Sequence, residues 1–116
     1  TWCAPCAAEL PLLQTIVAGN PHATALFVSL DSKDDGRRVQ ELTNNLGLLA
    51  PVVHLHSADP AATMVRLVPA WPERIPVTLV YSPDGREAAR FVGLVPPAEL
   101  AAALVPAPES PTTGAP

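Results

Sequence analysis

The sequence predicts an α/β domain with a central sheet flanked by helices. Segments with apolar residues at helical spacing alternate with short apolar runs that are bounded by turn residues. Near the C-terminal end, two strand-like segments flank a turn that contains proline and glycine. Such an alternation is typical of a layered sheet with helices on its faces. The length of 116 residues is enough for one domain with one core.

The N-terminal third predicts a helix, a strand and a loop. The helix covers residues 4–18 and contains Pro11, where we expect a kink. Gly19-Asn20-Pro21 ends this helix. The apolar run over 23–30 predicts a buried strand, and the polar residues over 31–36 predict a loop that begins with a turn or helix-capping pair.

The middle of the chain predicts a helix, a strand and a second helix. The first of these helices is indicated by an apolar stripe at spacings of three, four and three residues, formed by Val39, Leu42, Leu46 and Leu49. A short strand is predicted over 52–56. Asp59 before Pro60 predicts a helix start, because an N-cap aspartate followed by a first-turn proline is favoured. One face of this helix is apolar and contains Ala61, Met64, Val65 and Val68.

The C-terminal third predicts a hairpin, a helix and a tail. The strands cover 77–82 and 87–92, and the turn over 82–85 has proline at its favoured second position. A short helix over 97–105 closes the domain, which we expect to span 1–105. The Pro-rich segment 106–116 has no apolar periodicity and predicts a disordered tail.

The charge pattern argues against nucleic-acid binding, and the length of the apolar runs argues against a membrane-spanning helix. The net charge is −4, and the six arginines and one lysine are scattered rather than clustered. Nucleic-acid binding is therefore not expected, because phosphate backbones favour clustered basic residues. No apolar run approaches the roughly 18 residues that a membrane helix needs.

The chemistry of the chain is concentrated in Trp2-Cys3-Ala4-Pro5-Cys6, where two thiols lie three residues apart at a predicted helix start. Residues at this spacing are neighbours on the first turn and can form a disulfide. The helix N-terminus favours negative charge, so we expect the pKa of Cys3 to lie below the free value of about 8.5 and Cys3 to be the attacking thiol. Cys6 is then the resolving thiol, with the more buried side chain. Pro5 stiffens the turn without losing a hydrogen bond.

Two alternative uses of the cysteines remain open. Together with His54 and His56, which share a face if 52–56 is a strand, they could nominally form a Cys₂His₂ metal site. The pair could also be a static disulfide in a binding module. The tight spacing and the helix-start context favour a redox pair with no bound metal and no dissociable cofactor.

The motif resembles the active site of thioredoxin-like proteins. Pro11, five residues after Cys6, is similar to the proline inside the active-site helix of that fold. Ile75-Pro76 before the hairpin resembles the loop that carries the family's cis-proline. The resemblance implies that Pro76 packs against the disulfide and that Ile75 and Pro76 support partner binding. It also implies that Trp2 covers the disulfide.

Within this superfamily, Cys6-Ala-Ala-Glu9-Leu-Pro11 and Thr78-Leu-Val-Tyr-Ser-Pro83-Asp-Gly85 look most like the TlpA/ResA-type oxidoreductases. This resemblance implies that Glu9 tunes the thiols. It also implies an extracytoplasmic protein, in the periplasm or on the outer face of the membrane, whose anchor would be N-terminal, with a role of the kind seen in cytochrome c maturation. The partners would be protein disulfides and dithiols, and we expect a monomer.

In the thioredoxin fold a core strand leads directly into the Trp-Cys motif. Nothing precedes Thr1 in the sequence, so we expect a domain that is incomplete at its N-terminus. The first core strand would then be missing from the sheet. We therefore expect the stability and activity of this chain to depend on that strand.

Overall fold

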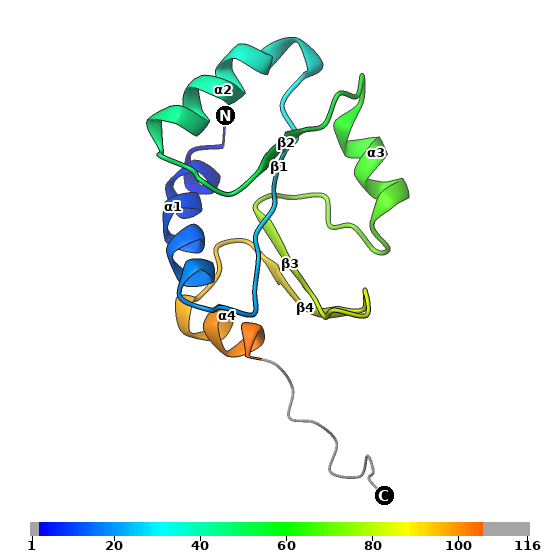
Figure 1. The fold of residues 1–116 in the computed structure, drawn as a ribbon. Helices are drawn as coiled ribbons and strands as arrows, with labels where there is room; N and C mark the ends of the chain where they lie inside the picture. Colours follow the sequence, from blue (N-terminus) through cyan, green and yellow to red (C-terminus); the bar gives the residue numbers. More distant parts are fainter. Residues whose placement is uncertain (1–2, 106–116) are drawn as a thin grey trace, which may run out of the picture.

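The computed structural model describes residues 3–105 and contains, in that range, four α-helices, one short 3₁₀ helix and four strands (Figure 1). The elements follow one another as α1 (Ala4–Ala18), β1 (Phe27–Ser29), η1 (Lys33–Asp35), α2 (Gly36–Asn45), β2 (Val52–His54), α3 (Pro60–Leu67), β3 (Val77–Tyr81), β4 (Glu87–Val92) and α4 (Pro97–Leu104). Trp2 and the predicted tail lie outside the described residues. Helices alternate with strands, as the sequence predicts.

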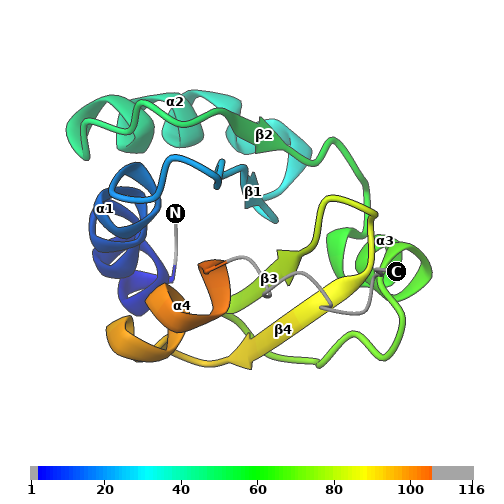
Figure 2. The same ribbon diagram turned by 60° about the horizontal axis from the view of Figure 1, so that its bottom comes forward.

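Two two-stranded sheets stand in place of the single central sheet that the sequence predicts. β1 and β2 pair in parallel, with Val28 opposite Val53, and β3 and β4 pair antiparallel, with Leu79 opposite Arg90. The sheets are separate because no strand of residues 3–105 lies between β1 and β3. A cavity of about 1340 Å³, lined by residues of both β1 and β3, lies there instead. Figure 2 shows the two sheets apart, with α2 along the outer side of the β1–β2 pair.

The buried core lies where α1 and α4 meet the β3–β4 hairpin. Its buried members are Leu13, Val95 and Leu100. Five partly buried residues pack against them, namely Ile16, Phe27, Val80, Phe91 and Leu104. Full burial of one such side chain is worth about 1.5–3 kcal/mol. This packing holds α1 in place, and α1 carries the two cysteines.

Side-chain hydrogen bonds attach α1 to two other parts of the molecule. Gln14 Oε1 accepts hydrogen bonds from the backbone N–H groups of Leu49 and Ala50, at 2.6 and 3.0 Å. Asn20, just beyond α1, donates from Nδ2 to the carbonyl oxygen of Leu104 at 3.1 Å. The helix is therefore bound to the loop between α2 and β2 and to the end of α4.

Several predicted elements are confirmed where the local signals are strong. α1 runs through Pro11 from Ala4 to Ala18, the predicted range. The Asp59 carboxylate caps α3 by accepting a hydrogen bond from the N–H of Ala62 at 3.1 Å. In the hairpin turn, the carbonyl oxygen of Ser82 accepts from the N–H of Gly85 at 2.9 Å. The φ of Gly85 is 88°, a conformation that suits glycine.

The predicted strands of the N-terminal half are shorter in the structure. β1 covers only part of 23–30, and β2 only part of 52–56. The strands are short because the pairing between β1 and β2 extends only from Phe27 opposite Val52 to Ser29 opposite His54. The predicted loop over 31–36 contains η1 and the start of α2.

The apolar stripes predicted for α2 and α3 extend beyond what the structure buries. α2 ends at Asn45, and Gly47 follows it in the left-handed region with a φ of 64°. Leu49 therefore lies beyond the helix, with 91% of its surface exposed. On the predicted face of α3 half of the residues are buried: Met64 and Val68 are buried, whereas Ala61 and Val65 are exposed.

Candidate functional site

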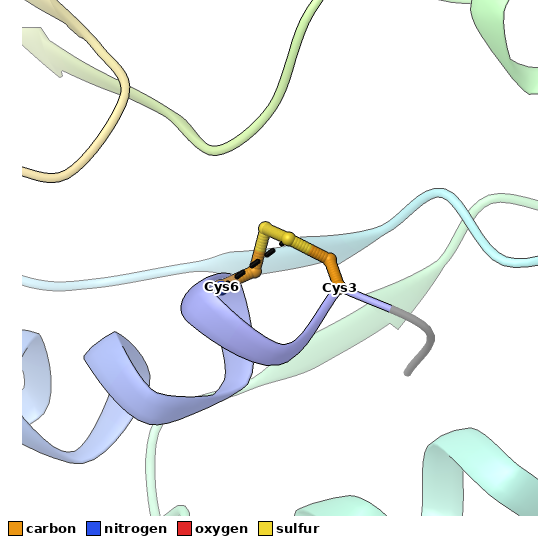
Figure 3. The surroundings of a disulfide bond; sticks show 2 residues. All are labelled: Cys3 and Cys6. Carbon is orange, nitrogen blue, oxygen red and sulfur yellow. Dashed lines mark hydrogen bonds between the residues drawn. A yellow bond between two sulfur atoms is a disulfide. The ribbon is translucent and has the colours of Figure 1, made fainter.

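Cys3 and Cys6 form a disulfide on the first turn of α1. The Sγ–Sγ distance is 1.97 Å and the Cα–Cα distance is 5.2 Å (Figure 3). Cys3 is the N-cap residue of α1 and has an extended backbone, with φ −94° and ψ 93°. Its Sγ accepts a hydrogen bond from the backbone N–H of Cys6 at 3.3 Å. The sulfur of Cys3 thus takes the position of an N-cap acceptor, as the sequence predicts.

The electrostatic setting of this turn favours negative charge on Cys3. A helix N-terminus presents unpaired N–H groups and the positive end of the macrodipole. The first turn of α1 contains no acidic residue that would oppose this effect. Pro5 lies in this turn, where its missing N–H leaves no hydrogen bond unmade.

Both cysteines are half-buried. Both also line the large cavity between the two sheets. The greater burial of Cys6 stays a prediction. The distinction between the two thiols that the structure does show is that Cys3 holds the N-cap position and Cys6 lies within the helix.

The loop between α3 and β3 borders the same cavity as the disulfide. Trp71, Ile75 and Pro76 line this cavity together with Cys3 and Cys6. All three loop residues are half-buried. The peptide bond between Ile75 and Pro76 is cis, which the family resemblance implied. The structure therefore brings these loop residues and the disulfide to one cavity, whereas Trp2 lies outside the described residues.

Glu9 is buried, with 7% of its surface exposed, and it lines the same cavity. Its Oε2 accepts a hydrogen bond from the backbone N–H of Val95 at 2.6 Å. Glu9 lies one turn beyond Cys6, at the position for which the resemblance implied a tuning role. Glu9 therefore has a structural role, because this hydrogen bond joins α1 to the segment before α4.

The two histidines are neighbours, but only His54 belongs to β2. Their ring centroids are 4.6 Å apart in an edge-to-face arrangement. His54 Nε2 lies 3.1 Å from the carbonyl oxygen of Asp31 and 2.9 Å from that of Ser32. Because carbonyl oxygens only accept, Nε2 carries the hydrogen here. His54 thus fixes the turn after β1.

The structure does not assemble the alternative metal site from its described residues. In the range 3–105, no three or more His, Cys, Asp or Glu side chains are grouped so that they could hold a metal ion. His54 is engaged with two carbonyl oxygens. A Cys₂His₂ site would need both histidines beside the cysteines, and this arrangement is not present.

Two polar residues, Asp31 in the cavity wall and Arg90 in the hairpin, have roles that the sequence patterns do not reveal. Asp31 is only 3% exposed, and its Oδ2 accepts from Ser29 Oγ at 2.5 Å. Arg90 in β4 donates to the carbonyl oxygens of Pro69 and Ala70, which begin the loop that contains Pro76. The one sequence signal for Arg90 is a charged residue inside a strand, between Ala89 and Phe91.

Comparisons with known proteins give no further identification. No protein-family model matches the chain, and no curated protein is significantly similar to it. In the part of the chain that the structure describes, no helix is both long and apolar enough to cross a membrane.

Proposed function

We propose that the chain is a thiol–disulfide oxidoreductase with a thioredoxin-like fold of the TlpA/ResA type. The observation that carries this proposal is the position of the cysteine pair. Cys3 Sγ is the N-cap acceptor of α1 and is bonded to Cys6 one turn further on. A sulfur held there is stabilised as a thiolate, which is the form that attacks disulfides.

The reaction proceeds in two exchange steps. The Cys3 thiolate attacks one sulfur of a partner disulfide, so that a Cys3–partner bond forms and the other partner sulfur leaves as a thiolate. Cys6 then loses its proton to solvent and attacks Cys3 Sγ. This step restores the Cys3–Cys6 bond and releases the second partner sulfur. Two electrons have then passed from the cysteine pair to the partner, and the sequence run backward oxidises a partner dithiol.

The two thiols have different roles mainly because the helix N-terminus lowers the pKa of Cys3. Each unit by which it lowers the pKa of Cys3 corresponds to about 1.4 kcal/mol in favour of the thiolate. Cys6 lies within the turn, with its backbone N–H directed to Cys3 Sγ. Attack therefore starts at Cys3, and Cys6 completes the cycle.

The two separate sheets support the proposed fold. Among residues 3–105, β1 and β3 each have one unpaired edge, and both contribute residues to the cavity between the sheets. A single strand placed there would pair with both edges and join the halves into one sheet. In thioredoxin-like proteins the strand at this place leads into the active-site motif. Such a strand would fill the part of the cavity that lies between β1 and β3.

The cavity wall also suggests how a partner would dock. Ile75 and Pro76 lie directly before β3 and share the cavity with the disulfide. A partner segment could lie along their backbone as an added strand, which presents its disulfide to Cys3 with little side-chain recognition. We infer protein disulfides and dithiols as partners. From the resemblance alone, we infer an extracytoplasmic site of action.

A redox titration tests this function. The chain is equilibrated in glutathione or dithiothreitol buffers, and free thiols are counted by the mass shift on alkylation, with Cys6→Ala as control. A single two-electron midpoint is expected, and a value near about −270 mV would indicate a reductant, whereas one near about −120 mV would indicate an oxidant. The proposal would be contradicted if the two thiols were oxidised independently of each other and if their alkylation rates, followed against pH, gave pKa values of about 8.5, the value of a free cysteine.

A further inference from the structure

Arg90, a partly exposed arginine of the hairpin, reaches across to the loop that lines the same cavity as the disulfide. Arg90 belongs to β4, and its side chain is 20% exposed. Nη1 donates to the carbonyl oxygen of Ala70 at 2.6 Å, and Nη2 donates to that of Pro69 at 2.8 Å. These two carbonyls begin the segment 69–76, which links α3 to β3 and contains Trp71, Ile75 and Pro76.

Glu87 holds the guanidinium in this orientation from the other side. Arg90 Nε donates to Glu87 Oε2 at 2.9 Å, and Nη2 donates to Glu87 Oε1 at 2.5 Å. This is a two-point, charge-assisted contact, the strong class of side-chain hydrogen bond. The hydrogen bond from Arg90 lowers the pKa of the Glu87 carboxyl, and the same bond raises the pKa of Arg90. The pair is therefore charged at neutral pH.

Arg90 supplies the hydrogen bonds at the start of the loop, whereas at its end the carbonyl oxygen of Pro76 accepts from the N–H of Gly93 at 2.8 Å. Ala70 has a φ of 53°, a left-handed conformation that non-glycine residues adopt at a cost. Pro69 has no N–H to donate. In the described residues, the hydrogen bonds to the backbone of 69–75 come from Arg90 alone. A lysine could not replace it, because one ammonium lacks the planar fork that reaches two carbonyls and a carboxylate together.

We infer that the Arg90–Glu87 pair is a positioning device that holds the loop 69–76 in the shape needed for exchange with protein partners. This inference rests on the proposed oxidoreductase function. Arg90 acts through the loop and is not a catalytic residue. Its removal leaves the sulfur atoms and the first turn of α1 as they are, but it frees the part of the cavity wall against which a partner backbone would lie.

The test compares two substrates in four variants of the full chain. Arg90→Lys and Glu87→Gln weaken the device, Arg86→Ala is the matched control, and the parent chain is the reference. Arg86 is a neighbouring arginine whose contact to Asp84 is exposed, with Nε 3.4 Å from Oδ2 and 87% of the arginine side chain exposed. The substrates are a protein disulfide, insulin, and a small aromatic disulfide that needs no docking surface.

We expect Arg90→Lys to slow reduction of insulin about tenfold, while the rate of reduction of the small disulfide changes less than about twofold. The reason is that a displaced loop slows only the substrate that the loop positions, and the small disulfide does not dock on it. Glu87→Gln should act in the same direction, and Arg86→Ala should act on neither substrate. Amide hydrogen exchange over 69–76 should accelerate in the first two variants only. Equal slowing of both substrates, or unchanged hydrogen exchange in the loop, would overturn the inference while leaving the oxidoreductase function standing. If the parent chain reduces neither substrate, the proposed function fails and this role of Arg90 fails with it.

Discussion

The carboxylate of Glu9 accepts a hydrogen bond from the backbone N–H of Val95, 2.6 Å away, across 86 positions of the chain. The contact is buried, because Glu9 is 7% and Val95 is 5% exposed. It joins the helix that carries the disulfide to the segment that leads into α4. Glu9 therefore has a structural role, to which the family resemblance adds a proposed effect on the thiols.

Substitutions at Glu9 separate these two roles. Glu9→Ala leaves the buried N–H of Val95 without a partner, so we expect a loss of about 1–3 kcal/mol in the free energy of unfolding, measured in urea. Glu9→Gln keeps an acceptor oxygen and should retain most of that stability. If Glu9 also tunes the thiols, Glu9→Gln lowers the pKa of the cysteine thiols in the reduced protein, because a nearby negative charge disfavours thiolates. An unchanged alkylation-rate profile against pH would leave only the structural role.

Single cysteine variants separate the attacking thiol from the resolving thiol. Cys6→Ala keeps the N-cap sulfur, so it should accumulate a mixed disulfide with a protein partner. Cys3→Ala should form little of this adduct, because its remaining thiol lies inside the turn and not at the N-cap. Mass spectrometry after acid quenching measures both. The opposite result, with the adduct accumulating in Cys3→Ala, would reverse the assigned roles.

The ion pair of Glu87 and Arg90 should make stability depend on pH. The hydrogen bond from Arg90 lowers the pKa of Glu87 below its ordinary value of 4.5. A carboxyl whose pKa is lowered on folding stabilises the protein above its unfolded pKa, and this contribution is lost as the pH falls through the folded pKa. The difference in unfolding free energy between the parent chain and Glu87→Gln should therefore be constant from about pH 6 upward and shrink below about pH 4.

Salt provides the control for that experiment. Glu87 has a side chain that is 33% exposed, so added salt should screen part of the difference. Urea unfolding at low and high ionic strength, across the same pH values, measures this. A difference that stays the same from pH 3 to pH 7 would show that the pair contributes through packing rather than charge.

Filling the cavity with a strand should stabilise the protein. The variant carries a segment of about six valine, leucine and isoleucine residues before Thr1, and we expect this segment to pair with the edges of β1 and β3 that are unpaired among residues 3–105. We expect the free energy of unfolding to rise by at least about 2 kcal/mol, because apolar side chains are removed from water and the backbone groups of β1 and β3 gain partners. The matched control is the same segment with a proline at its centre. Proline has no backbone N–H to donate, so it disfavours an interior strand. Equal stabilisation by both segments would exclude strand pairing as the cause.

The sequence predicts elements well where a short local signal decides them. Asp59 and Pro60 mark the start of α3, and the turn from Ser82 to Gly85 defines the hairpin. The cysteine pair at the start of α1 is likewise a local feature, and its spacing of three residues allows the disulfide that the structure contains. These signals act within a few residues, so no knowledge of the rest of the chain is needed.

Other features depend on partners that are distant in sequence, and the sequence does not specify them. The ends of β1 are set by the extent of its pairing with β2, which stops at Ser29 opposite His54. The two contacts that shape the candidate site, from Glu9 to Val95 and from Arg90 to Ala70, each span long stretches of chain.

The attachment of α1 on two sides has a consequence for the proposed disulfide exchange. Gln14 binds the loop before β2, while Glu9 and Asn20 bind the region of α4. A helix fixed in this way can exchange a sulfur–sulfur bond for two thiols without moving as a body. The geometric change between the two redox states is then confined to two side chains on one turn. In the proposed exchange reaction, we therefore expect little rearrangement of the backbone in each cycle, so that the same scaffold would present either state to a partner.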